Sequence, residues 1–467
     1  MDARSATAES RSAETDLLLR EAIERARASE FYSQHLQGHR VRHRGDLAAL
    51  PLTEKRHIRE SSPFGMLAVP PSKAWHYHES SGTTGEPVST WCGLPEVRRM
   101  AEIVQRLVPE LADDAILLNR FPLFAPVSFV FEETLRLTGS CHIPAGNMTW
   151  DVPFDRAIEF IRRLGATALA SLPLEPILLF ELARELKIDV RRELNTLRVI
   201  CLGGAVLPPA LRRRIETDWE ARVVEIYGSN ETMLMGVGCT HGRLHLCEEL
   251  LEIEVLHPDT HEPVAPGELG VMTVTSLVHH VMPLVRYFTG DLVRVQDDVC
   301  PCGRRGRTAQ VLGRVEETIR YGEKSALAYD VLEAAYDFAD RLDSRIFFAL
   351  VLRQNLHLLV ETSNPAGSAN AAAERQLAEK IGLPVTVEYL PVGEVLDRTA
   401  LLRTPRIYKP SVIADWREAK RRPVTVMEAI LEWPTFDGKT LLHLGRRGVR
   451  TARRRRRLWR QDQYGGW

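Results

Sequence analysis

The stretch Glu79–Thr90, with the sequence ESSGTTGEPVST, says most about the fold and chemistry of this chain. Its hydroxyl side chains surround two glycines, so the loop offers hydroxyl groups beside backbone N–H groups that no side chain covers. Such a loop suits a polyphosphate, because glycine lets the backbone approach a ligand closely. The residues that would hold it are Ser80, Ser81, Gly82, Thr83, Thr84 and Gly85. A plain surface turn rich in serine and threonine is the alternative, since the Gly-Lys-Ser/Thr ending of the common P-loop is missing.

The composition is that of an ordinary globular protein. The chain has 467 residues, of which 44% are hydrophobic and 26% charged, which excludes collagen, coiled coil and wholesale disorder. Lys+Arg number 61 and Asp+Glu 62, so the formal net charge is −1. The chain as a whole therefore lacks the net positive charge that is typical of proteins that bind nucleic acid or a membrane surface. Only eight of the basic residues are lysines, which limits the candidates for a catalytic lysine.

We expect a cytoplasmic protein with no membrane partner. No run of the sequence approaches the roughly 18 to 20 apolar residues of a membrane span. The first residues lack the basic and then apolar pattern of a secretory leader. Seven cysteines, an odd number, favour a reducing compartment.

The alternation of short apolar runs with charged helical stretches between residues 75 and 312 predicts an α/β fold. Leu250–Leu256 and Leu292–Val295, set among turns, indicate a small antiparallel β meander. After residue 313 the pattern predicts a compact α+β unit. Its expected helices are Tyr329–Arg341 and Ala371–Ile381, and its expected strands are Ile346–Leu352, Leu356–Val360 and Val385–Tyr389.

Three parts are therefore predicted along the chain. Residues 1–313 form a large domain, 314–415 a small domain, and 416–467 an extension rich in arginine. The arginine run could contact RNA, DNA or acidic lipid, but tails of this kind are more often solvated. We do not expect a nucleic-acid partner, and a homodimer is left open.

The chain resembles the phenylacetate-CoA ligase branch of the adenylate-forming superfamily from about Phe31 to Lys409. The resemblance rests on Glu54–Pro70, on the SSGTTGEP loop and on three further motifs in the order of the family. It implies a large N-terminal AMP-binding domain with parallel sheets and a small antiparallel β unit. A small, mobile α+β C-terminal domain would follow.

The first motif, Ile226–Thr232 (IYGSNET), is similar to the Tyr-Gly-x-Thr/Ser-Glu of the family. The resemblance implies that Tyr227 stacks on adenine, that Gly228 leaves room for the nucleotide and that Glu231 ligates Mg²⁺. Asn230 and Thr232 flank that carboxylate and would also contact the nucleotide.

The second motif, Met282–Asp291, is similar to the Arg-Tyr-Arg-Thr-Gly-Asp of the family, and Asp291 would bind the ribose hydroxyls. Upstream, a glycine-rich turn fits the loop that lies against the adenine and the acyl group in relatives. That turn consists of Gly203, Gly204 and Ala205.

The third motif, Val311–Gly322, is similar to the hinge of the family, about which the small domain turns between two half-reactions. Arg314 would reach the ribose, Glu316 occupies the hinge position, and Gly322 matches a glycine near the acceptor tunnel. By resemblance a catalytic lysine lies near the end of the small domain, and Lys409 is the match. An exposed lysine on a linker is the alternative reading of Lys409.

A separate set of residues predicts a structural zinc site. Cys239, His245, Cys300 and Cys302 supply three thiolates and an imidazole, a donor set typical of tetrahedral Zn²⁺. His241 or Cys247 could replace His245 as the fourth ligand. Ordinary turn cysteines are the alternative.

The chain departs from the family at several positions. Glu86 stands in the phosphate loop where a lysine is usual, Asn230 precedes the Mg²⁺ carboxylate where threonine or serine is usual, and Phe288 replaces a second arginine. The segment Phe121–Phe131 replaces a glycine-rich stretch, and its aromatic residues could line an aryl pocket or be plain core.

The sequence thus predicts an enzyme, an ATP-dependent, AMP-forming carboxylate ligase. It would use Mg-ATP to convert a small, aromatic carboxylic acid into an acyl-adenylate with release of pyrophosphate, and pass the acyl group to CoA. Two alternatives stay open. The acceptor could be an amine or hydroxyl of a second small molecule in specialised metabolism, or the chain could be a degenerate homologue without catalysis.

Overall fold

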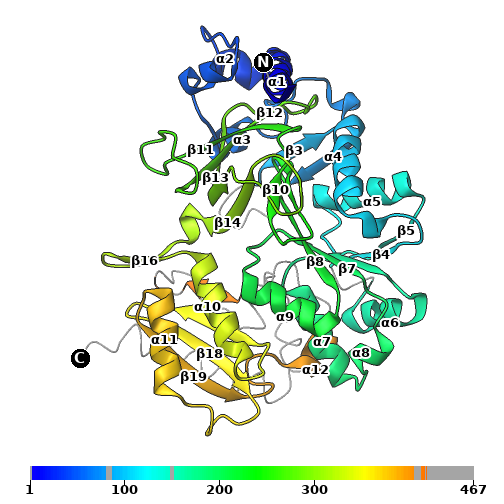
Figure 1. Ribbon diagram of the computed structural model, residues 1–467, viewed down its shortest axis with the longest axis vertical. Helices are drawn as coiled ribbons and strands as arrows, with labels where there is room; N and C mark the ends of the chain where they lie inside the picture. The colour runs from blue at the N-terminus through cyan, green and yellow to red at the C-terminus, as the bar shows by residue number, and fades with distance from the viewer. Residues whose placement is uncertain (1–2, 80–86, 148–151, 404–411, 416, 418–467) are drawn as a thin grey trace. The chain divides into compact units, whose positions relative to one another are not determined.

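The computed structural model describes residues 3–79, 87–147, 152–403, 412–415 and 417, and these form two compact units (Figure 1). Unit 1 consists of residues 1–117, 123–144 and 224–316, and unit 2 of residues 118–122, 145–223 and 317–467, as far as each is described. Within these described ranges, no helix has the length and apolar character that crossing a bilayer requires.

Unit 1 combines five helices with a mainly antiparallel sheet. Its helices are α1 (Ala3–Ala26), α2 (Glu30–His35), α3 (Lys55–Ser61), α4 (Leu94–Leu107) and α5 (Pro126–Thr138). Its strands are β1 (Thr53–Glu54), β2 (His76–Glu79), β3 (Ser89–Cys92), β5 (Cys141–Pro144), β8 (Arg222–Ser229), β9 (Met233–Gly238), β10 (Leu244–Leu246), β11 (Leu251–Leu256), β12 (Leu269–Ser276), β13 (Tyr287–Gln296) and β14 (Thr308–Arg314). Short 3-10 helices span Arg44–Ala49, Pro71–Lys73 and Pro109–Leu111.

The strands β11, β12, β13, β14, β10, β9 and β8 follow one another across the sheet of unit 1, and each neighbouring pair is antiparallel. The predicted antiparallel meander is therefore confirmed. Strand β1 pairs with β13 in parallel, with Thr53 opposite Tyr287 and Glu54 opposite Phe288.

A buried hydrogen-bond cluster fixes β1 against β13. The Tyr32 and Thr53 hydroxyls lie 3.1 Å apart, and Thr53 Oγ1 donates to the Val285 carbonyl at 2.7 Å. The Tyr32 hydroxyl also accepts the Val285 N–H at 2.9 Å. Burial raises the pKa of Tyr32 to about 12, so its hydroxyl keeps its proton. Because these polar atoms have partners, the start of α3 is held firmly beside β13.

Unit 2 has a parallel pair of strands with four helices, followed by the C-terminal α+β segment. The first part contains β6 (Ala168–Ser171), β7 (Val199–Gly203), α6 (Phe154–Leu164), α7 (Glu175–Glu185), α8 (Val190–Glu193) and α9 (Pro209–Trp219). The second part contains β15 (Ile319–Tyr321), β16 (Lys324–Ala326), α10 (Ala328–Asp340), β17 (Phe347–Val351), β18 (Leu356–Thr362), α11 (Ala371–Ile381), β19 (Val385–Pro391), α12 (Arg398–Arg403) and β20 (Ile413–Asp415). Three of the described elements contain residues of both units: β4 (Ile116–Asn119), the 3-10 turn Val315–Glu317, and β8, whose first two residues, Arg222 and Val223, belong to unit 2.

The C-terminal segment follows the predicted pattern closely. Its sheet has the order β19, β18, β17, β20, and Figure 1 shows α10 and α11 next to each other beside it. The helix predicted for residues 371–381 has those bounds, and the strands predicted near residues 346, 356 and 385 correspond to β17, β18 and β19. The mixed α/β fold is thus confirmed, whereas the domain boundaries at residues 313 and 415 stay predictions.

Buried ion pairs join the two parts of unit 2. Arg398, 8% exposed, donates to Glu181 of α7 at 2.8 Å and to Glu361 of β18 at 2.9 Å. Arg345 donates to Asp218 of α9 at 2.7 Å. Burial raises the pKa of Glu361, while Arg398 and backbone N–H groups act against that rise. Each buried carboxylate of this network therefore has a guanidinium partner.

Replacing Arg398 with methionine should destabilise unit 2. The substitution leaves Glu181 and Glu361 buried without their cation, and breaking a buried pair in this way typically costs about 3–5 kcal/mol. Urea-induced unfolding followed by fluorescence measures the change. The matched control is Arg341→Met, whose pair with Asp337 at 3.0 Å is half exposed and should contribute below about 1 kcal/mol. Equal effects of the two variants would contradict the assignment.

Candidate functional site

Asp291 is the centre of the predicted nucleotide site. Tyr227 of β8 donates its hydroxyl hydrogen to Asp291 Oδ2 at 2.9 Å, and Arg314 Nε donates to Asp291 Oδ1 at 3.2 Å. Asp291 and Arg314 are direct partners in the β13–β14 ladder. Burial raises the pKa of Tyr227, and the Asp291 carboxylate adds to the rise. The structure thus brings together three residues that lie far apart in the sequence.

A short turn presents Asp291 to its neighbours. Thr289 Oγ1 accepts the Asp291 N–H at 3.0 Å and donates to the Met272 carbonyl at 2.8 Å. Gly290 between them has φ +80°, a conformation that favours glycine. The Thr-Gly-Asp sequence is therefore required locally to aim the carboxylate.

The motif Ile226–Thr232 covers the end of β8 and the turn that leads into β9. A Cβ on Gly228 would lie 1.7 Å from the Met233 carbonyl oxygen, so the close approach of the two strands itself requires glycine there. The hydroxyls of Ser229 and Thr232 lie 2.9 Å apart and each accepts the other residue's backbone N–H. These contacts account for Thr232 in the turn.

Asn230 connects this turn to the strand that leads into the phosphate loop. Its Nδ2 donates to the Glu79 carbonyl at 3.1 Å, and Glu79 is the last residue of β2. The departure from the family at this position thus has a structural role in this chain. Phe288, another position at which the chain departs from the family, lies on β13. Its ring centroid is 5.0 Å from that of His261.

Glu231 is a buried carboxylate, 5% exposed, and its nearest cation is Lys55 at the start of α3. Lys55 Nζ lies 3.4 Å from Glu231 Oε1, which has no hydrogen-bond partner among the described residues. Burial acts to raise the pKa of Glu231, but Lys55 and nearby hydrogen-bond donors outweigh it, so the pKa is lowered. The carboxylate is therefore ionised at neutral pH.

This environment fits the magnesium ligand that the sequence predicts. Mg²⁺ prefers hard oxygen ligands and is usually bound by one or two carboxylates together with substrate phosphates. Glu231 offers such an oxygen in the Oε1 that lacks a hydrogen bond. The sequence did not identify Lys55 as a site residue, because its proximity depends on the pairing of β1 with β13.

Several other predicted residues lie elsewhere. Gly203 ends β7 in unit 2, and Gly204 and Ala205 follow it; Gly204 has φ +80° and a Cβ there would be 2.9 Å from Leu172. The loop Ser80–Gly85, Glu86 and Lys409 lie outside the described residues, as does most of the arginine-rich extension.

The cysteine and histidine residues predicted as a metal site form one cluster in unit 1. The ligand atoms of Cys239, His245, Cys300 and Cys302 all lie within 4.8 Å of one another. Cys239 Sγ is 3.8 Å from Cys300 Sγ, and Cys302 Sγ is 3.3 Å from His245 Nε2. Two loops and strand β10 bring these four residues together.

The spacing of the cluster fits zinc. A tetrahedron with arms of about 2.3 Å has edges of about 3.8 Å between sulfur atoms. His245 belongs to the cluster, whereas the alternative His241 contacts Cys239 only through its backbone N–H. Burial raises the pKa of the other alternative, Cys247, to about 12, so that thiol stays protonated unless a metal binds it. His245 is therefore the better fourth ligand.

We expect freshly purified protein to contain about one zinc ion per chain, as elemental analysis would measure. Cys302→Ser should remove most of the metal, because it deletes one of four ligands. Cys141→Ser is the matched control, since Cys141 is an exposed cysteine outside the cluster. Wild-type protein without zinc, or equal metal contents in the two variants, would exclude the site.

The aromatic segment Phe121–Phe131 serves two purposes. Phe121 and Phe131 are buried and belong to the core. Phe124 is 51% exposed, and the Phe129 ring centroid lies 3.9 Å from that of His76 on β2. The two alternatives for this segment are therefore divided among its members, with Phe124 and Phe129 left as candidates for a binding surface.

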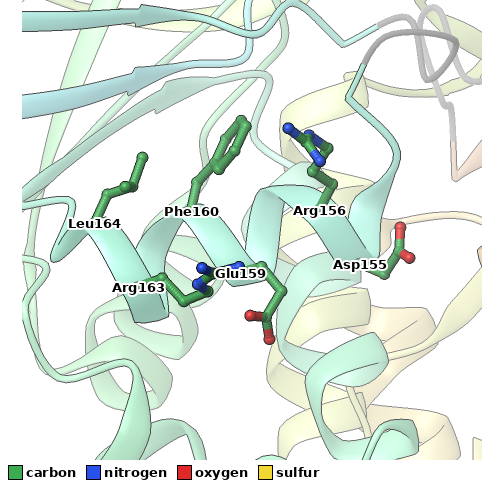
Figure 2. Close-up of a pocket in the computed structure, with 6 residues that line it drawn as sticks. All are labelled: Asp155, Arg156, Glu159, Phe160, Arg163 and Leu164. Carbon is green, nitrogen blue, oxygen red and sulfur yellow. The ribbon is translucent and has the colours of Figure 1, made fainter.

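A hollow of about 420 Å³ lies along helix α6 in unit 2. Figure 2 shows its six lining residues, all from this one helix. They are Asp155, Arg156, Glu159, Phe160, Arg163 and Leu164. None of these is a predicted site residue, and their charges alternate in sign, so the hollow is an ordinary surface feature.

Comparison with known proteins finds similar sequences and a similar fold. Residues 67–283 match the protein family described as AMP-binding enzyme, a range that includes Tyr227 and Glu231. The chain is similar in fold to a solved 2-hydroxyisobutyryl-CoA ligase in a post-adenylation state, with a TM-score of 0.75 at 20% identity over 88% of this chain and 90% of the other. The comparison thus shows that the two proteins have the same kind of fold.

The curated proteins with similar sequences are phenylacetate-coenzyme A ligases, the branch that the sequence motifs resemble. The protein from Thermus thermophilus is 31% identical over 287 residues, which cover 59% of this chain and 62% of that protein. The Escherichia coli protein is 29% identical over 260 residues, or 54% of this chain and 58% of that protein. The matched part thus spans less than two thirds of either relative.

Proposed function

We propose that this protein is an ATP-dependent ligase that converts a carboxylic acid into an acyl-adenylate and then into a CoA thioester. The observation that carries the proposal is the group formed by the buried residues Tyr227, Asp291 and Glu231 and the partly exposed Arg314 in unit 1. An aromatic ring, two carboxylates and a guanidinium are the groups that adenine, ribose hydroxyls and a metal-bound polyphosphate require.

The chemistry has two steps. In the first, a carboxylate oxygen of the substrate attacks the α-phosphorus of ATP, a P–O bond breaks, and pyrophosphate leaves. In the second, the sulfur of CoA attacks the acyl carbon, AMP leaves, and the thiol proton passes to solvent or a base. No oxidant or reductant is needed, because both steps are group transfers.

The roles of the residues follow from their chemistry. Asp291 would accept hydrogen bonds from both ribose hydroxyls, while the hydrogen bonds from Arg314 and Tyr227 hold its carboxylate in position. Mg²⁺ held by Glu231 would neutralise charge on the phosphates during the first step. The loop Ser80–Gly85 would bind the phosphates, and Lys409 would approach the α-phosphate with the mobile C-terminal domain.

The acid is proposed to be aromatic and small. Support comes from the names of the curated relatives and from the aromatic side chains of Phe124 and Phe129 beside β2, the strand that ends where the phosphate loop begins. CoA is proposed as the acceptor because the names of the curated relatives include coenzyme A. We keep a cytoplasmic location and the transfer to an amine or hydroxyl as further predictions.

Hydroxamate formation tests the first step. A panel of aryl and short aliphatic acids is incubated with Mg-ATP and hydroxylamine, with and without CoA, while AMP and pyrophosphate are measured in the same wells. We expect at least one aryl acid to give hydroxamate together with equal amounts of AMP and pyrophosphate. Without hydroxylamine, consumption of CoA with that acid would identify the acceptor, and adenylation without CoA consumption would favour an amine or hydroxyl.

A degenerate homologue is the second candidate, because Glu86 places a carboxylate in the phosphate loop. In an active enzyme, Glu86→Lys should change the ATP requirement only moderately, by removing a charge that repels the phosphates. We expect the variant to lower the KM for ATP in the hydroxamate assay. Variant and wild type both inert across the panel, in folded protein, would favour the degenerate homologue.

A further inference from the structure

Lys55 has a fixed position within unit 1. It is the first residue of α3 and follows β1 directly, and β1 is bound to β13 through Thr53 and Glu54. The hydroxyl cluster of Tyr32 and Thr53 anchors the same strand. The lysine therefore reaches Glu231 from a rigid base, although the two residues are far apart in the sequence.

Lys55 and Arg314 each form an ion pair with one carboxylate of the candidate nucleotide site. Glu231 lies 3.4 Å from the Lys55 ammonium, and Asp291 lies 3.2 Å from Nε of Arg314. The Glu231 side chain is 4% exposed, but that of Lys55 is 34% exposed. The Lys55 side chain is thus the more accessible member of this ion pair.

We propose that Lys55 is a binding residue for the polyphosphate of ATP, and this inference rests on the proposed function. A divalent cation on Glu231 removes the partner of the Lys55 ammonium and places a like charge beside it. An anion bound to that cation restores the balance, because it pairs with both. Lys55 therefore favours the metal together with polyphosphate over the metal alone.

The sequence gives this chain a particular need for such a cation. Its phosphate loop has Glu86 where a lysine is usual, so the loop itself does not supply the positive charge. Of the eight lysines, Lys55, Lys73, Lys187, Lys324 and Lys380 lie in the described residues. Among these five, Lys55 is the one that forms an ion pair with a predicted nucleotide-site residue.

A purely structural ion pair makes a different prediction. If Lys55 only stabilises Glu231 and the turn around it, replacing the lysine should weaken the binding of all adenine nucleotides equally. Alternatively, it should lower only the stability of the protein. If it binds polyphosphate, the loss should depend on how many phosphates the nucleotide carries. Comparing ATP with AMP therefore separates the two roles.

The experiment measures nucleotide affinity without turnover. Isothermal titration calorimetry with Mg²⁺ and no carboxylic acid gives the Kd of ATP and of AMP for wild type, Lys55→Gln and Lys55→Arg. Glutamine keeps a hydrogen-bond donor for Glu231 but no charge. We expect Lys55→Gln to raise the Kd of ATP by at least about tenfold and the Kd of AMP by less than about threefold, because a charge-assisted bond to phosphate is lost. Lys55→Arg should keep ATP within about threefold of wild type.

Lys73→Gln is the matched control, since Lys73 is an exposed lysine of the same unit. It should leave both affinities unchanged, and thermal unfolding checks that every variant is folded. Equal losses of ATP and AMP in Lys55→Gln, or an unchanged Kd for ATP, would overturn the inference. Should Lys55→Gln not fold, Lys55→Met is measured in its place against the same criteria. A wild type that binds no ATP would instead contradict the proposed function.

Discussion

The register of strand β13 is the constraint on which the site depends. Its carboxyl half pairs with β14, so that Asp291 faces Arg314, and its first residues pair with β1, so that Thr53 faces Tyr287. A shift of one residue would turn every β13 side chain to the opposite face of the sheet. The Asp291 carboxylate, the Lys55 ammonium and the loop that carries Cys300 all take their positions from this one strand.

The two basic residue types are used differently in the two units. In unit 2, arginines satisfy the buried carboxylates, and the Arg398 fork serves both Glu181 and Glu361. A planar guanidinium suits such fixed, multiple contacts. At the candidate nucleotide site the cation beside Glu231 is a lysine, a compact charge on a flexible stem that can exchange one partner for another. This contrast separates pairs that hold the fold from a pair suited to binding.

The sequence was most informative where local pattern and chemistry suffice. The periodicity of residues 371–381 predicts α11 with its observed bounds, and the residue types of the metal cluster predict a donor set that the structure brings together. The same sequence could not identify Lys55, because β1 is only two residues long and pairs with a strand more than two hundred residues away. It predicts a nucleotide contact for Asn230 and a departure from the family, but not its bond to the Glu79 carbonyl, which depends on tertiary structure. The sequence pattern thus did not reveal contacts between residues that are far apart in the chain.

Gly228 has a consequence for the evolution of this chain. A side chain there would collide with the Met233 carbonyl, so the strand pair β8–β9 would exclude most substitutions even in a descendant that no longer catalysed any reaction. Selection for folding alone would therefore preserve the glycine of the signature motif. If Lys55 binds ATP as proposed, its partly exposed side chain would no longer be under selection once ATP did not have to bind. Among homologues of this protein, loss of the lysine would mark a retired enzyme earlier than loss of the glycine.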